Sequence, residues 1–124
     1  MTENAKTILA VDDDIDLLGM VQLLLEDAGY RVATAADGQE ALEKVAAELP
    51  DLILLDMKMP GMNGWEFARV FRERYNHLTP IVVLTAAEDA RKRAAEVGAD
   101  GYLGKPFDID DLVRIVERHV KPTE

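Results

Sequence analysis

The chain has 124 residues, the length of one ordinary domain, so we expect a single domain over residues 1–124 with a folded core from about residue 6 to about residue 120. Its 48 % hydrophobic and 31 % charged residues exclude a disordered or fibrous protein, and its net charge of −10 opposes direct binding of nucleic acid. Because the sequence has no cysteine, no secretory signal and no apolar run of roughly 18 residues, we expect a cytoplasmic protein that does not enter a membrane.

The first half of the chain predicts two units of a β-strand followed by an α-helix. Thr7–Val11 forms the first strand, and the helix after it is expected to stop at Gly29 as its C-cap. Arg31–Ala35 forms the second strand, and Asp37 and Glu40 have the spacing of a capping box for the next helix. The residues expected on the buried faces of these helices are Leu17, Leu18, Val21, Leu24, Leu25, Ala28, Ala41, Leu42, Val45 and Leu49.

The second half continues the alternation. Asp51–Asp56 contains an unbroken apolar run from Leu52 to Leu55, which indicates a central strand covered by helices on both faces. Asn63 and Glu66 have capping-box spacing for a third helix. The remaining elements are a fourth strand at Ile81–Thr85, a short helix to about Val97, a fifth strand centred on Tyr102-Leu103 and a last helix capped by Asp108.

Together these elements give a (βα)5 order and an α/β fold. Short crossovers force a parallel sheet with helices on both faces, and the flavodoxin-like strand order 2-1-3-4-5 is the usual solution. We therefore expect a three-layer sandwich around a parallel five-stranded sheet. Strands one and three are neighbours in that order, and ligands bind beyond their carboxyl ends, where Asp12, Asp13, Asp14 and Asp56 lie.

The acidic residues at this position have two interpretations. Asp14 is placed as a helix N-cap, where its side chain accepts backbone N–H groups. Asp12, Asp13 and Asp56 would bring three negative charges together, which repel one another and raise their own pKa values. Oxygen ligands of this kind suit a hard divalent cation, and an open site favours Mg²⁺.

Other phosphate and metal motifs fit less well. A calcium loop read from Asp12, Asp14 and Asp16 has Leu17 where glycine is required and Leu23 where a bidentate glutamate is required. An Asp-x-Asp phosphatase motif would lack the Thr or Val expected after Asp12, as well as a cap domain. Three aspartates after the first strand would repel the phosphate of a flavin.

Four motifs at the ends of four predicted strands carry a resemblance to a known family. They are Val11–Asp13, Leu55–Gly64, Leu84–Ala86 and Gly98–Phe107. Over nearly the whole chain, this set closely resembles the receiver domains of two-component response regulators. The resemblance implies that a sensor histidine kinase transfers a phosphoryl group to Asp56. It also implies direct Mg²⁺ ligation by Asp13, Asp56 and the backbone carbonyl of Lys58, with Asp12 acting through a water.

The resemblance also assigns three residues around the phosphoryl group. Lys105 resembles the cation on the phosphoryl oxygens and Thr85 the hydroxyl that responds to them, so that both join Asp56 in the catalytic set. Tyr102 resembles the aromatic switch that enters the space left by Thr85. The same likeness raises the expectation of a cis bond between Lys105 and Pro106. The protein would catalyse only its own phosphorylation and dephosphorylation, and would not otherwise be an enzyme.

The remaining notable residues concern the lifetime of the phosphoryl group and possible donors. Lys58 follows the phosphoacceptor by two residues, where its side chain could cover the phosphoryl group, and Ala87 offers no group to orient an attacking water. We therefore expect a long-lived phosphoryl state. Trp65 is interpreted as a packing residue, and His77 and His119 as surface or helix-face residues rather than phosphodonors.

Three outputs are compatible with the sequence. The first is a stand-alone receiver whose fourth-helix, fifth-strand and fifth-helix face controls a partner, with a phosphorylation-dependent homodimer as one form. The second is a phosphorelay intermediate that passes its phosphoryl group to a histidine phosphotransfer protein, and the third is a receiver fragment of a longer DNA-binding regulator. Arg91, Lys92 and Arg93 suggest an acidic partner, although a solvated helix face is the commoner meaning of such a run.

Overall fold

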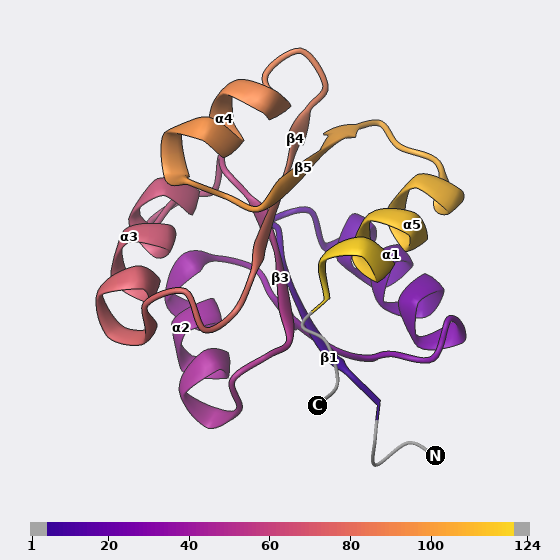
Figure 1. Cartoon of the computed structure of the whole chain (residues 1–124), viewed down its shortest axis with the longest axis horizontal. Helices are drawn as coiled ribbons and strands as arrows, with labels where there is room; N and C mark the ends of the chain where they lie inside the picture. The colour runs from indigo at the N-terminus through magenta and orange to yellow at the C-terminus, as the bar shows by residue number, and fades with distance from the viewer. Residues whose placement is uncertain (1–4, 121–124) are drawn as a thin grey trace.

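The computed structural model describes residues 5–120 and contains five strands alternating with five helices (Figure 1). In chain order the elements are β1 (Thr7–Val11), α1 (Ile15–Asp27), β2 (Arg31–Ala35), α2 (Gly38–Ala47), β3 (Leu52–Asp56), α3 (Gly64–Tyr75), β4 (Ile81–Ala86), α4 (Ala90–Val97), β5 (Gly101–Lys105) and α5 (Ile109–His119). Residues 1–4, which belong to the segment searched above for a secretory signal, and residues 121–124 lie outside the described residues. Within residues 5–120, no helix is long and apolar enough to cross a bilayer.

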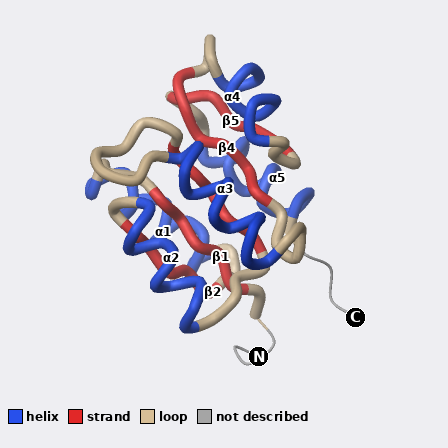
Figure 2. The backbone as a smooth tube through the Cα atoms, turned by 90° about the vertical axis from the view of Figure 1, so that its left-hand side faces the viewer, coloured by secondary structure: helices blue, strands red, loops and turns tan. Residues whose placement is uncertain are grey.

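The strands form one parallel sheet in the order β2-β1-β3-β4-β5, which confirms the predicted fold class. In Figure 1, α1 and α5 lie on one side of the sheet and α2, α3 and α4 on the other. Figure 2 shows α2 and α3 from their outer side, with strands behind them. Each helical layer covers its own apolar cluster, so the sheet is buried on both faces.

β3 lies in the middle of the sheet, and its apolar side chains are fully buried. Successive side chains of a strand point to opposite faces. Leu52 and Leu54 accordingly join the cluster under α1 and α5, whereas Ile53 and Leu55 join the cluster under α2, α3 and α4. Burial on both faces explains the unbroken apolar run, and it fixes Asp56 at the carboxyl end of the central strand.

Side-chain caps begin three of the helices as predicted, although Glu40 accepts the backbone N–H of Ala36 and does not complete a capping box with Asp37. Asp14, Asp37 and Asn63 each accept a hydrogen bond from a backbone N–H of the first helical turn. Glu66 completes a reciprocal capping box with Asn63. Asp108 stands at the N-cap of α5, but its side chain makes no such bond, so the predicted side-chain capping is wrong there.

Element boundaries differ from the prediction in three places. The C-cap of α1 is the exposed Ala28, which was predicted to be buried, and Gly29 follows it with a left-handed φ of 101°. β3 begins at Leu52, one residue later than predicted, and the Asp51 side chain before it accepts a hydrogen bond from the first residue of β1. β4 runs on to Ala86, one residue beyond the predicted end.

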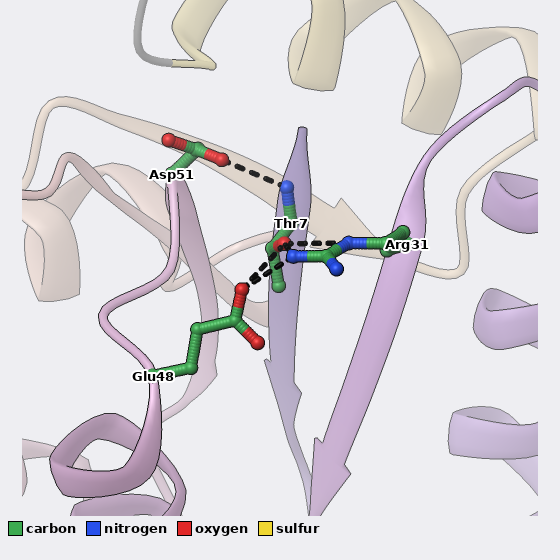
Figure 3. Close-up of polar contacts among 4 residues, drawn as sticks. All are labelled: Thr7, Arg31, Glu48 and Asp51. Carbon is green, nitrogen blue, oxygen red and sulfur yellow. Dashed lines mark hydrogen bonds and ion pairs between the residues drawn. The ribbon is translucent and has the colours of Figure 1, made fainter. Parts of the chain in front are cut away.

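A polar cluster joins the amino ends of β1 and β2 to the segment between α2 and β3 (Figure 3). The backbone N–H of Thr7 donates to the Asp51 carboxylate at 2.8 Å. Arg31 donates to the Thr7 hydroxyl at 2.7 Å and forms an ion pair with Glu48. Polar contacts therefore link the segments at this end of the sheet, whereas Asp12, Asp13 and Asp56 lie at the opposite end, where β1 and β3 end.

Candidate functional site

Three carboxylates meet where β1 and β3 end. One oxygen from each of Asp12, Asp13 and Asp56 lies within 4.8 Å of the other two. Asp12 and Asp56 are only 2 % and 5 % exposed, whereas Asp13 is exposed to solvent. The fold therefore brings the three predicted carboxylates together, with Asp12 and Asp56 buried and Asp13 facing solvent. Asp14 is occupied differently, since its side chain accepts the Leu17 N–H at the start of α1.

Lys105, the last residue of β5, brings an ammonium group to this cluster. Its Nζ lies 2.7 Å from Oδ2 of Asp12 and 3.6 Å from Oδ1 of Asp56. Burial lowers the pKa of Lys105, but the hydrogen bond to Asp12 and the charges of Asp12 and Asp56 outweigh this effect, so the pKa is raised overall. The ammonium is thus held mainly by Asp12 and reaches Asp56 at a longer distance.

The charge on Asp56 is only partly compensated. Burial raises the pKa of Asp56 most, and the negative charges of Asp12 and Asp13 raise it further, to about 6. The Lys105 ammonium and a hydrogen bond from the Lys58 backbone act in the opposite direction without balancing these effects. At neutral pH the site therefore holds a buried carboxylate in an electrostatically unfavourable position.

The cluster fits a hard divalent cation. Its donors are carboxylate oxygens, the ligands that Mg²⁺ prefers, and one lysine cannot neutralise three carboxylates. The pKa of Asp56 is raised first by burial and then by the negative charges of Asp12 and Asp13, and a bound cation would offset both effects. The exposed side at Asp13 would leave room for the waters that Mg²⁺ usually keeps.

Thr85 lies near the end of β4, where it is 4 % exposed. It stands opposite Gly104 in the sheet register, and Tyr102 stands opposite Val83. Residues two apart in a strand share a face, so Thr85 and Tyr102 project from the same face of the sheet. Tyr102 is 46 % exposed, so its ring lies toward solvent in this structure. The Lys105–Pro106 bond that follows is cis, as the resemblance led us to expect.

Two glycines shape the site and were not singled out from the sequence. A Cβ on Gly64 would lie 2.7 Å from the carbonyl oxygen of Asp56, and one on Gly104 would lie 2.5 Å from the Cα of Ala87. Both distances are too short for any other residue to fit without movement. A glycine inside a strand signals a close approach of backbones, and Gly104 carried that signal. Gly64 had no comparable local signal.

The loop between β3 and α3 places Lys58 beside the carboxylates. Met57 and Met59 are buried in the core under α2, α3 and α4, whereas Lys58 between them is exposed. The backbone N–H of Gly64 donates to the carbonyl oxygen of Met57 at 3.0 Å, which closes the loop at its far end. Burial of Met57 and Met59 on either side fixes the Lys58 backbone near Asp56, while the Lys58 side chain is exposed to solvent.

Comparisons with known proteins agree with this geometry. The response regulator receiver domain family matches residues 8–117. The chain is 43 % identical over 122 residues to response regulator MprA of Mycobacterium leprae, which covers 94 % of this chain and 53 % of that protein. It is 42 % identical over 108 residues to response regulator ArlR of Staphylococcus saprophyticus, which covers 86 % of this chain and 48 % of that protein. The chain thus spans about half the length of the curated relatives it matches.

Solved structures give the same result over almost the full length of the matched chains. Chemotaxis response regulator CheY4 of Vibrio cholerae has a TM-score of 0.86 at 41 % identity, covering 94 % of this chain and 100 % of that one. Response regulator protein TrrA of Thermotoga maritima, solved in complex with Mg(2+)-BeF, has a TM-score of 0.83 at 35 % identity, covering 93 % and 99 %.

Proposed function

Because the chain belongs to the response regulator receiver domain family, we propose that Asp56 accepts a phosphoryl group from a sensor histidine kinase. One observation carries this proposal most directly. Asp56 is a buried carboxylate that lies within 4.8 Å of two further carboxylates and 3.6 Å from the ammonium of Lys105. Phosphoryl transfer depends mainly on positioning and on neutralisation of charge, and this arrangement supplies residues for both.

In the proposed reaction, a carboxylate oxygen of Asp56 attacks the phosphorus of a phosphohistidine. A new P–O bond forms as the P–N bond to the imidazole breaks, which leaves an acyl phosphate on Asp56. Lys105 lies close enough to shift from Asp12 toward the new phosphoryl oxygens. Bound Mg²⁺ would supply further positive charge to the phosphoryl oxygens. Asp12, Asp13, Asp56 and the carbonyl of Lys58 are the residues proposed to hold it.

We propose that the new phosphoryl group is read first by Thr85. Its hydroxyl is the side-chain donor at the end of β4, and its movement would free space on the sheet face that it shares with Tyr102. Tyr102 could then turn inward and change the surface formed by α4, β5 and α5. That surface would contact the output partner. We further propose that the protein is cytoplasmic, that a sensor histidine kinase phosphorylates it, and that phosphorylation can drive formation of a homodimer.

Intact mass measurement after incubation with acetyl phosphate and Mg²⁺ tests the central step. The wild-type protein is expected to gain the mass of one phosphoryl group, and Asp56→Asn is expected to gain none. Asp14→Asn is the matched control, because Asp14 is a neighbouring exposed helix cap outside the cluster. A mass gain that survives in Asp56→Asn would remove Asp56 as the acceptor. Gel filtration of the same samples tests dimerisation.

A second candidate concerns the whole protein rather than the site. The curated relatives MprA and ArlR are about twice as long as the part aligned with this chain, which supports the receiver of a longer regulator as an alternative to a stand-alone receiver such as the fully matched CheY4 chain. Sequencing the complete gene distinguishes the two. A longer reading frame with a DNA-binding region would establish the longer regulator.

A further inference from the structure

The short helix α4 is weakly anchored by apolar packing. Of its eight residues only Ala90 and Ala94 are buried, and alanine removes little apolar surface from water. Its N-cap residue Asp89 makes no side-chain hydrogen bond to the first turn. Val97 is partly buried against the core and adds to this small apolar anchor, which polar contacts can supplement.

Polar contacts with α3 provide such an anchor. The indole Nε1 of Trp65 on α3 donates to Oε1 of Glu96 on α4 at 2.9 Å. Arg93 binds both oxygens of Glu96 at 3.0 Å, and its guanidinium carbon lies 5.4 Å from the centroid of the Trp65 ring. Arg93 and Glu96 both lie on α4, so their ion pair is internal to that helix, and the contacts that cross to α3 are the Trp65–Glu96 hydrogen bond and the packing of Arg93 over the Trp65 ring. We call Trp65, Arg93 and Glu96 the α3–α4 latch.

A neighbouring contact supports the latch at the end of α4. Arg72 on α3 donates to the carbonyl oxygen of Gly98, the C-cap of α4, at 3.2 Å. Two polar contacts to α3 therefore hold the carboxyl-terminal part of α4. The amino-terminal part is instead attached through a three-residue loop to the strand end that carries Thr85.

The latch is also connected to the carboxylate site through the backbone of α3. Gly64 packs so closely on the end of β3 that a Cβ there would lie 2.7 Å from both the carbonyl oxygen of Asp56 and the Cα of Met57. Trp65 is the next residue along the chain. The backbone N–H of Gly64 also donates to the carbonyl oxygen of Met57 at 3.0 Å, so a shift of the backbone at the end of β3 would be passed to the start of α3 and to Trp65.

We propose that the α3–α4 latch couples the state of Asp56 to the position of α4. The latch holds α4 against α3, and occupation of Asp56 moves Trp65 relative to Glu96. The coupling half of this inference rests on the proposed phosphoacceptor function, whereas the anchoring half does not.

Amide hydrogen exchange tests the anchoring. Glu96→Ala removes the acceptor of the Trp65 and Arg93 bonds, and we expect about tenfold faster exchange of the α4 amides with little change in α3. Glu96→Gln keeps an acceptor for the indole and should have a smaller effect. Glu73→Ala is the matched control, because Glu73 pairs with Arg69 on α3 itself. Exchange in Glu96→Ala within twofold of wild type would overturn the anchoring role.

Trp65 is the only tryptophan of the chain, so its fluorescence reports on the latch without labelling. Beryllofluoride with Mg²⁺ serves as the phosphoryl mimic, and a bound ¹⁹F NMR signal shows separately whether it occupies the site. We expect Trp65 emission to change on binding in the wild type, and this response to be reduced at least twofold in Glu96→Ala with the ¹⁹F signal retained.

The outcomes of this experiment separate the two proposals. Absence of a bound ¹⁹F signal in the wild type would count against the phosphoacceptor function. A bound ¹⁹F signal with unchanged Trp65 emission would refute the coupling alone. A full response in Glu96→Ala would show that Trp65 senses Asp56 independently of Glu96, and unchanged exchange of the α4 amides on beryllofluoride binding to the wild type would refute the coupling to α4.

Discussion

At the residue scale, Asp56 combines burial with two like charges. Its pKa is raised from 3.8 to about 6, so the folded protein binds a proton at Asp56 more tightly than the unfolded chain does. Between these two values the unfolded chain holds fewer protons, and the free energy of unfolding must fall as the pH rises. Above pH 6, ionisation of Asp56 lowers the free energy of unfolding by about 3 kcal/mol, at about 1.4 kcal/mol per pKa unit. The carboxylate that we propose as the acceptor therefore destabilises the metal-free fold.

Asp56→Asn should remove this penalty. In EDTA at pH 8, we expect the variant to be about 2 to 3 kcal/mol more stable than wild type, with a smaller difference near pH 4. Urea unfolding at both pH values measures it. Asp14→Asn should stay within about 0.5 kcal/mol of wild type, because Asn caps a helix as well as Asp does. An equal gain at both pH values would show that ionisation of Asp56 is not its cause.

We predict that the Lys58 side chain affects the lifetime of the phosphoryl group on Asp56. Its side chain is exposed two residues after Asp56, on a loop whose neighbouring methionines are buried. We expect Lys58→Asn to speed phosphate release several-fold, because a shorter side chain shields the acyl phosphate less from water. Intact mass followed over time after removal of the donor gives the rate. Lys44→Asn, at an exposed position on α2, controls for the lost charge, and equal release rates in wild type and Lys58→Asn would refute shielding.

At the element scale, we expect replacement by alanine to have opposite effects on stability at two glycines, one in a strand and one in a helix. Gly104 lies in β5, where a Cβ would meet the Cα of Ala87 at 2.5 Å, whereas Gly19 lies on the exposed face of α1 with no atom within 4 Å of a Cβ. Gly104→Ala should cost about 1 to 3 kcal/mol by overpacking. Gly19→Ala should add about 0.5 to 1 kcal/mol through helix propensity. Thermal unfolding measures both, and a stabilised Gly104→Ala would contradict the close contact.

Local patterns predicted the elements well where local interactions create them. The capping residues Asp37 and Asn63 act within three residues of the N–H groups they accept from, so their spacing was sufficient. The apolar run of β3 reflects burial on both faces, which any central strand of such a sheet needs. Asp108 occupies the predicted N-cap position of α5, but its side chain makes no capping hydrogen bond.

Contacts between distant residues were less accessible to sequence reasoning. Strand order brought Asp12, Asp13 and Asp56 together, because parallel strands place their carboxyl ends at one edge. It did not predict that Lys105 would pair chiefly with Asp12, 93 residues away in the chain. The Trp65 bond to α4 spans 31 residues and depends on how two helices pack, so Trp65 could only be interpreted as packing.

At the scale of the whole molecule, charge is distributed unevenly. α3 and α4 carry six of the 14 Lys and Arg residues, on a chain with a net charge of −10. The basic run at the start of α4 is partly structural, because Arg93 pairs with Glu96, whereas Arg91 and Lys92 remain exposed. The rest of the chain, including the acidic cluster, therefore carries the excess negative charge and attracts cations in general.

Specific Mg²⁺ binding must be distinguished from this general attraction. A cation that binds only the folded protein at a hundred times its dissociation constant adds about 2.7 kcal/mol to the free energy of unfolding. We expect saturating Mg²⁺ to stabilise wild type by about this amount. NaCl of equal ionic strength should stabilise it less, because Na⁺ only screens the charges and does not bind at the three carboxylates. Asp13→Asn should lose most of the Mg²⁺ effect, since Asp13 is the exposed member of the cluster, whereas Asp14→Asn should keep it. Urea unfolding with Mg²⁺, NaCl or EDTA measures each difference. If NaCl matched Mg²⁺, or if both variants behaved alike, the stabilisation would come from the overall charge and not from the three carboxylates.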